Sequence, residues 1–420
     1  MTDDGGMLGA TPRNASDDAV VDSSVWVTWG WVVTRLALLT VLFTLESRVV
    51  GDITYFGRSL ADLPDVGLGR TLREYPLLAV GVLAVPWWVA RLTGLVYGLV
   101  FVLAALLVDG AFTAALARQR GPGRVSLVVW LAGVPAMGAL AYARFDLVPG
   151  VLVAAVVLLH ARHPRVAALC LALAVGVKLW PVLLVPLLVA RVRDRRGVLG
   201  VIVGTGVVLV AATTLLAGAA RVWSPLAYQS DRGLQVESVV ATPVMLARSV
   251  HGATWTVGYA SSKAYEISGP GVHALLLVST VLSAGSAVVL LVAWVRAFRL
   301  PAGALTSDAF VWLVLFSVLA FTCTSKVLSP QYLLWLLPVA AAGLTVVSDR
   351  AVLGRWCAVL VVAMVLSQAV FPWLYGPLVL DPGSAPWRAT ATLVLRNLVL
   401  VWLMVAAGRR ASAALRPGQS

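Results

Sequence analysis

The stretch VAALCLALAVGVKLWPVLLVPLLVAR, residues 166–191, holds two apolar runs that meet at Lys178 and Pro181. Each run is shorter than the ~20 residues that a helix needs to cross the hydrocarbon core of a bilayer. Irregular backbone is tolerated at that depth only where it is buried in protein or lines a cavity. The stretch therefore predicts a broken helical hairpin beside a cavity, inside a helical membrane protein.

The composition of the whole chain also indicates a membrane protein. Its 420 residues are 60% hydrophobic and only 12% charged, and the mean hydropathy is +0.92. These values lie far outside the range of soluble globular proteins and exclude a soluble enzyme. The net charge of +13 fits arginine-rich cytoplasmic loops and does not indicate nucleic-acid binding, because the sequence shows no soluble basic domain.

Apolar runs separated by charged residues, glycine and proline predict an all-α polytopic fold with about twelve transmembrane helices. Residues 1–24 are expected to form a disordered cytoplasmic tail, 25–410 one transmembrane domain, and 411–420 a second cytoplasmic tail. Residues 76–91 are expected to form a juxtamembrane or re-entrant helix. The expected spans are 26–45, 95–117, 125–142, 147–161, 166–178, 180–191, 198–217, 272–296, 309–324, 329–347, 353–371 and 389–408.

Arginine clusters set the expected orientation of these spans. If the spans alternate, the clusters all fall on one side, which the positive-inside rule identifies as the cytoplasm. Both termini then lie in the cytoplasm, and the protein is a multi-pass protein of the plasma membrane. Residues 46–75 and 218–271 form the long outer loops, so any chemistry is expected on the extracytoplasmic face.

Two outer segments carry acids that are candidates for chemistry. GDITYF, residues 51–56, places Asp52 just after the first span, with Tyr55 three residues on and on the same face of a helix. A carboxylate at the bilayer edge could act as a general base, although the spacing also fits a solvated loop acid. ARFDLVPG, residues 143–150, supplies Arg144 and Asp146, which fit either a substrate site or an interfacial salt bridge.

Cationic and hydrogen-bonding side chains gather at the other outer corners. Lys178 either extends harmlessly to the interface or binds an anionic headgroup. In SKVLSPQYLLWLLP, residues 325–338, a helix starts at Pro330, where free N–H groups favour an anion. The candidates for binding a phosphate are Lys178, Lys326, Arg144 and Arg232, and the candidates for binding the rest of a substrate are Tyr55, Asp146, Gln235, Glu237, Ser329, Gln331 and Tyr332.

Arg35 and Asp109 differ from these residues because both lie deep in predicted spans, at similar depth. An unpaired charge at that depth is costly. We therefore expect a structural ion pair between them, in preference to a proton relay. The cysteines show no metal-ligand spacing, so neither a metal site nor a cofactor is expected.

Several of these segments resemble glycosyltransferase family 87, bacterial membrane mannosyltransferases of the type C superfamily. The resemblance lies in GDITYF, REYPL, ARFDLVPG, LALAVGVKLWPVLLVPLL, DRGLQVES and KVLSPQYLLWLLP, which together extend from Gly51 to Pro338. The chain departs from the family pattern at Leu77, where a second proline is frequent, and at Gln229, where a histidine is frequent.

The resemblance implies a type C fold, a polyprenyl-phosphate-mannose donor and a lipid-anchored glycan as acceptor. It also implies inversion at the anomeric carbon, with the base at the position of Asp52. An arabinofuranosyltransferase of the same superfamily stays open as an alternative. A lipid or glycan transporter would explain the spans equally well, but transporters concentrate charges near the midplane, whereas here they gather at outer helix ends.

Overall fold

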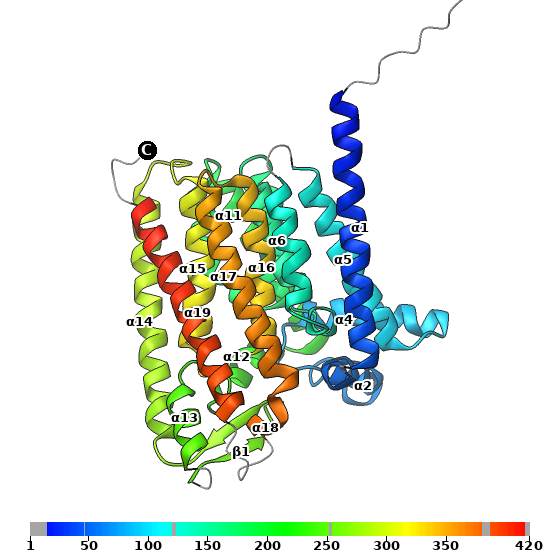
Figure 1. The fold of residues 1–420 in the computed structure, drawn as a ribbon, viewed down its shortest axis with the longest axis vertical. Coiled ribbons are helices and arrows are strands. Elements are labelled where there is room, and N and C mark those ends of the chain that lie inside the picture. Colours follow the sequence, from blue (N-terminus) through cyan, green and yellow to red (C-terminus); the bar gives the residue numbers. More distant parts are fainter. Residues whose placement is uncertain (1–14, 46, 120–122, 252–253, 380–386, 416–420) are drawn as a thin grey trace, which may run out of the picture.

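The computed structural model describes residues 15–45, 47–119, 123–251, 254–379 and 387–415. The described chain forms a bundle of apolar helices that run side by side (Figure 1), so the predicted all-α polytopic fold is confirmed in outline. The helices of the bundle are α1 (Ala15–Thr44), α5 (Tyr97–Ala117), α6 (Gly123–Ala136), α8 (Leu147–Leu159), α9 (Pro164–Val177), α10 (Val185–Arg191), α11 (Arg195–Ala217), α14 (Val272–Arg299), α15 (Ser307–Thr324), α16 (Leu333–Val346), α17 (Arg350–Gln368) and α19 (Trp387–Ala414).

The helices divide into a buried centre and an apolar periphery. Helices α15 and α16 are apolar on all sides and almost every residue in them is buried, as expected for the core of a large bundle. Helices α11 and α14 are also apolar, yet few of their side chains are buried and many apolar ones are exposed. Such long exposed apolar faces fit contact with lipid.

Seven of the described helices are long and apolar enough to cross a membrane. They are α1 from Val25, α5, α11, α14, α15, α17 with the turn that follows it, and α19. The other five predicted spans coincide with shorter apolar helices, so the total of twelve spans stays a prediction. Residues 1–14 of the predicted disordered tail lie outside the described residues, and helix α1 already begins at Ala15.

The predicted broken hairpin is confirmed. Helix α9 ends at Val177, and Lys178 has an extended backbone with φ −151° and ψ 135°. A short 3₁₀ helix, Trp180–Leu184, then leads into α10. The break follows from Pro181 and Pro186, since proline starts a helix readily but cannot supply a hydrogen bond inside one.

The two predicted outer loops fold at one end of the bundle, opposite the start of α1 and the end of α19 (Figure 1). The first contains α2 (Gly51–Ala61) and α3 (Leu63–Val66), and the second contains α12 (Ala220–Ser230) and α13 (Thr242–Val250). The second also holds an antiparallel hairpin of β1 (Thr256–Tyr259) and β2 (Tyr265–Ser268), a small element that the all-α prediction did not include. Which end faces the cytoplasm stays a prediction.

Helix α4 (Leu77–Thr93) runs across the direction of the bundle helices (Figure 1). It covers the segment predicted as a juxtamembrane or re-entrant helix. The Arg91 guanidinium lies 5.1 Å from the centre of the Trp87 ring, and Trp88 is exposed. This pairing of aromatic rings with a cation is typical of a helix at a membrane interface.

The expected ion pair between Arg35 and Asp109 is confirmed. Arg35 donates to both carboxylate oxygens of Asp109, at 2.8 and 3.1 Å. The side chains of Trp31, Trp130 and Tyr142 donate to the same carboxylate. These bonds satisfy the buried charge and join α1, α5, α6 and α7 (Leu140–Ala143).

Candidate active site

A cavity of about 400 Å³ lies among α2, the hairpin turn and the corner before α16. Its size is typical of a site for a small molecule. Ten of the twelve candidate residues line it: Asp52, Tyr55, Arg144, Lys178, Arg232, Gln235, Glu237, Ser329, Gln331 and Tyr332. The other two, Lys326 and Asp146, lie directly behind lining residues, bonded to Gln235 and Lys178.

Main-chain bonds tie distant segments together around this cavity. The Gln235 backbone N–H donates to the carbonyl of Lys326 at 3.0 Å, and its side chain donates to the Ser329 hydroxyl at 3.3 Å. The Val236 N–H donates to the carbonyl of Tyr265 in β2 at 3.1 Å. The segment 231–238 is therefore fixed between the hairpin and the corner before α16.

Asp52 lies in the first turn of α2, where the helix dipole favours a carboxylate. Its Oδ2 is 2.9 Å from Nε of Arg144, and its side chain is 38% exposed. Arg144 is largely buried and also donates to the carbonyls of Val49 and Ala143. The ion pair orients the Asp52 carboxylate at the cavity wall and directs the Arg144 charge toward Asp52.

Lys178 is paired as well. Its Nζ donates to Oδ1 of Asp146 at 2.5 Å, and the Trp335 indole N–H donates to the same oxygen at 2.7 Å. Asp146 is only 2% exposed, so its carboxylate supports Lys178 from behind and does not face the cavity. Its predicted contact with substrate has no counterpart in this geometry.

Four aromatic rings surround the Lys178 ammonium. Its Nζ lies 5.9 Å from the ring centre of Tyr75, 5.1 Å from Phe145, 5.5 Å from Tyr332 and 5.0 Å from Trp335. Cation–π contacts of this kind attract an ammonium group to the ring faces. Lys178 therefore carries a fixed positive charge at the break of the hairpin.

Three other cations at or next to the cavity, Arg232, Lys326 and Lys263, have no carboxylate within ion-pair distance among the described residues. Arg232 contacts the Gln229 side chain at 3.5 Å, and Lys326 donates to the carbonyl of Ser230 at 2.9 Å. Partial burial lowers the pKa of Lys326, and an anion beside it would favour the charged form. Lys263, in the hairpin turn, is the third; its Nζ lies 5.7 Å from the centre of the Tyr55 ring.

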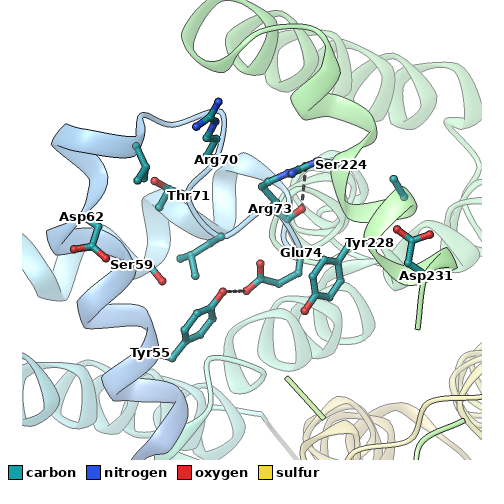
Figure 2. A pocket seen from close by; sticks show the side chains of 13 residues that line it. Tyr55, Ser59, Asp62, Arg70, Thr71, Arg73, Glu74, Ser224, Tyr228 and Asp231 are labelled. Atoms are coloured by element: carbon teal, nitrogen blue, oxygen red, sulfur yellow. Dashed lines mark hydrogen bonds between the residues drawn. The ribbon is translucent and has the colours of Figure 1, made fainter. Parts of the chain in front are cut away.

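Tyr55 lies one helical turn after Asp52 and donates its hydroxyl hydrogen to Oε1 of Glu74 at 2.7 Å (Figure 2). Burial and the Glu74 carboxylate raise the pKa of Tyr55 well above its ordinary value. The phenol therefore stays protonated and acts as a hydrogen-bond donor. This pair forms one side of the cavity.

Glu237 reaches the cavity wall but is 1% exposed. Nη1 of Arg396 lies 3.1 Å from its carboxylate, and Nη2 donates to its carbonyl at 2.7 Å. Burial raises the pKa of Glu237 to about 7, against the opposite effect of Arg396. The pair holds segment 231–238 on α19, so Glu237 shapes the wall of the site.

Sequence reasoning did not select several residues that line the cavity. They are mainly aromatic, with one lysine: Tyr75, Tyr228, Tyr259, Lys263, Tyr265, Phe371 and Tyr375. Lys263 could have been found because only three lysines occur in the chain. The tyrosines of the hairpin gave no such signal, since aromatic residues are also frequent at membrane interfaces.

The arrangement places a carboxylate, a neutral phenol and several cations around one small cavity. Among the described residues, no group of three or more histidine, cysteine, aspartate or glutamate side chains could hold a metal ion. The carboxylate can transfer a proton, and the fixed cations can stabilise an anion.

The model of glycosyltransferase family 87 matches residues 74–322, more than half of the chain. The matched region includes Lys178 and Arg232, and it begins after Asp52 and ends before Lys326. Neither the comparison with curated proteins nor the comparison with solved structures finds a match.

Proposed function

Because the chain belongs to glycosyltransferase family 87 and is a membrane glycosyltransferase, we propose that it is a mannosyltransferase with polyprenyl-phosphate-mannose as donor. The acceptor is a glycan on a lipid anchor, and both substrates reach the cavity from the bilayer. The reaction takes place on the extracytoplasmic face of the plasma membrane. The arginine distribution supports this side, since it leaves the cavity end of the bundle outside.

One observation carries the proposal: a partly exposed carboxylate and several cations from distant segments line the same cavity. A donor held by a lipid phosphate needs cations at the leaving group and a base at the acceptor. Asp52 comes from α2, whereas Lys178 follows α9 and Arg232 follows α12. The base and the cations thus belong to different segments of the wall.

In the proposed step, an acceptor hydroxyl oxygen forms a bond to the anomeric carbon of mannose. The bond between this carbon and the phosphate oxygen breaks, and polyprenyl phosphate leaves with the electron pair. The hydroxyl proton passes to the Asp52 carboxylate. A single displacement of this kind inverts the configuration at the anomeric carbon.

The cations stabilise the charge that develops on the leaving phosphate. Arg232 lines the cavity and contacts it directly. Lys326 lies behind Gln235 and contacts it once its ammonium leaves the carbonyl of Ser230. Neither cation has a carboxylate within ion-pair distance in the described structure. Lys178 and Arg144 share their charge with Asp146 and Asp52, so they contribute mainly to the positive potential of the cavity. Ser329, Gln331 and Tyr332 bind the sugar and phosphate oxygens.

The test uses purified protein in lipid nanodiscs, radiolabelled polyprenyl-phosphate-mannose and a lipid extract from the source cells. We expect label to appear in a glycolipid, with release of polyprenyl phosphate, and we expect transfer by Asp52→Asn to be slower by roughly a hundredfold or more. A parallel reaction with labelled polyprenyl-phosphate-arabinose tests the alternative donor. Transfer from the arabinose donor but not from the mannose donor contradicts the mannose assignment. Movement of intact donor across the bilayer without bond cleavage contradicts a transferase activity and favours a transporter.

A further inference from the structure

A second cavity, of about 390 Å³, lies against the first. The two cavities share Tyr55, Glu74 and Tyr228 as lining residues. The walls of the second cavity come from α2, α3, the turn at residues 70–74 and α12 (Figure 2). The cavities are therefore neighbours, with Tyr55 and Glu74 between them.

The second cavity is built on a fixed frame. Arg221 of α12 is 2% exposed, and its Nη2 donates to the carbonyls of Thr71 and Leu72 at 3.3 and 3.0 Å. Its Nη1 lies 2.6 Å from the Ser224 hydroxyl, which donates to the carbonyl of Arg73 at 2.9 Å. These bonds pin the turn to α12, so the space between them is formed before any ligand enters.

The lining chemistry selects a neutral ligand with many hydroxyls. Three carboxylates and two guanidinium groups surround the space, so the lining charge does not favour an anion. Carboxylates accept hydrogen bonds from hydroxyls and guanidinium groups donate to them, while tyrosine rings offer flat apolar faces. The charged lining residues are Asp62, Arg70, Arg73, Glu74 and Asp231.

We propose that the second cavity binds a neutral sugar unit of the acceptor, next to the unit that receives mannose. The inference rests on the proposed function, since it takes the first cavity as the transfer site. Tyr55 is one helical turn from Asp52, so a sugar held beyond Tyr55 and Glu74 adjoins the sugar whose hydroxyl reaches Asp52. The acceptor glycan then has at least two sugar units.

The experiment measures binding without any donor. The protein in nanodiscs is titrated with octyl α-mannoside and with octyl α-mannobioside, and the dissociation constants are measured by calorimetry. We expect the disaccharide to bind at least tenfold more tightly. Glycerol phosphate is the competing probe: displacement of the disaccharide that depends on Arg70 and Arg73 would overturn the neutral-sugar assignment in favour of an anionic headgroup.

Variants locate the difference in the second cavity. Ala227 of α12 lines this cavity, and Ala227→Trp should remove the preference for the disaccharide. Leu226→Trp is the matched control, because Leu226 is 53% exposed and lines neither cavity. If Ala227→Trp fails to fold, Asp62→Asn should weaken disaccharide binding about tenfold by removing a charged acceptor.

The outcomes separate the two hypotheses. Equal binding of the two glycosides, or a preference that Ala227→Trp and Asp62→Asn both leave intact, overturns the subsite even if mannose transfer is demonstrated. A cavity-dependent preference in a protein that transfers no mannose supports the sugar site and contradicts only the proposed reaction.

Discussion

Replacing Asp52 with asparagine tests the central element of the mechanism, because the change keeps the shape of the side chain and removes its capacity to accept a proton. Loss of a general base lowers turnover by roughly 10² to 10⁴-fold, which corresponds to about 3–6 kcal/mol in the activation barrier. We expect this loss with donor binding largely unchanged.

The structural cost of the same change is much smaller. The Asp52 carboxylate is 38% exposed, so its ion pair with Arg144 is worth at most about 1 kcal/mol. Arg144 keeps its bonds to the carbonyls of Val49 and Ala143. The catalytic effect therefore exceeds the effect on stability by a wide margin, and the variant should purify as a folded protein.

The assay is single-turnover transfer from labelled donor in nanodiscs, with donor affinity and thermal unfolding measured on the same preparation. Asp65→Asn is the matched control, since Asp65 is an exposed acid of the same outer loop and lines neither cavity. A folded Asp52→Asn protein that transfers sugar within a few-fold of wild type would refute the base role. Glu74 would then be the next candidate.

Four further predictions follow from the ion pairs and the topology. Lys178→Met should lower the free energy of unfolding by about 3–5 kcal/mol, because it leaves the Asp146 carboxylate buried without a cation. Adding Asp146→Leu should restore stability but not sugar transfer. A Lys178→Met protein as stable as the wild type would contradict the pairing of Lys178 with Asp146. Lys326→Met should lower turnover about tenfold with normal thermal unfolding, and unchanged kinetics would exclude contact with the phosphate. Burial raises the pKa of Glu237 from 4.5 to about 7, so between pH 4.5 and 7 the folded protein holds a proton that the unfolded chain has released. The stability of the protein should therefore fall as pH rises through this window. Thermal unfolding measured from pH 5 to 7.5 should show this slope in the wild type, and Glu237→Gln should abolish it. A single cysteine at Ser261, in a chain without Cys170, Cys323 and Cys357, should react with an impermeant maleimide in intact cells, and protection would reverse the proposed orientation.

The sequence predicted the helical elements well because membrane spans depend on local hydrophobicity. The break at Lys178 was also predictable, because the effect of the nearby prolines on the backbone is local. The hairpin of β1 and β2 was not predicted, since its eight strand residues carry no clear alternation and lie in a polar loop. Tertiary bonds, such as that from Val236 to Tyr265, stabilise it, and a local pattern does not contain them.

The candidate site also separates what the local sequence predicts from what tertiary contacts decide, and its charged residues show this. Arg144 and Asp146 stand two residues apart, and a local reading pairs them with each other or with solvent. In the structure, Arg144 has an extended backbone, and each of the two residues finds a partner far along the chain: Arg144 pairs with Asp52 and Asp146 with Lys178. The sequence identified many of the residues that meet at the cavity, but burial and backbone direction decide which charges neutralise one another. Among the described residues at the site, this pairing leaves Arg232, Lys263 and Lys326 without a carboxylate partner. In the proposed reaction, these three are therefore the cations available to a phosphate, while Lys178 and Arg144 contribute mainly to the positive potential of the cavity.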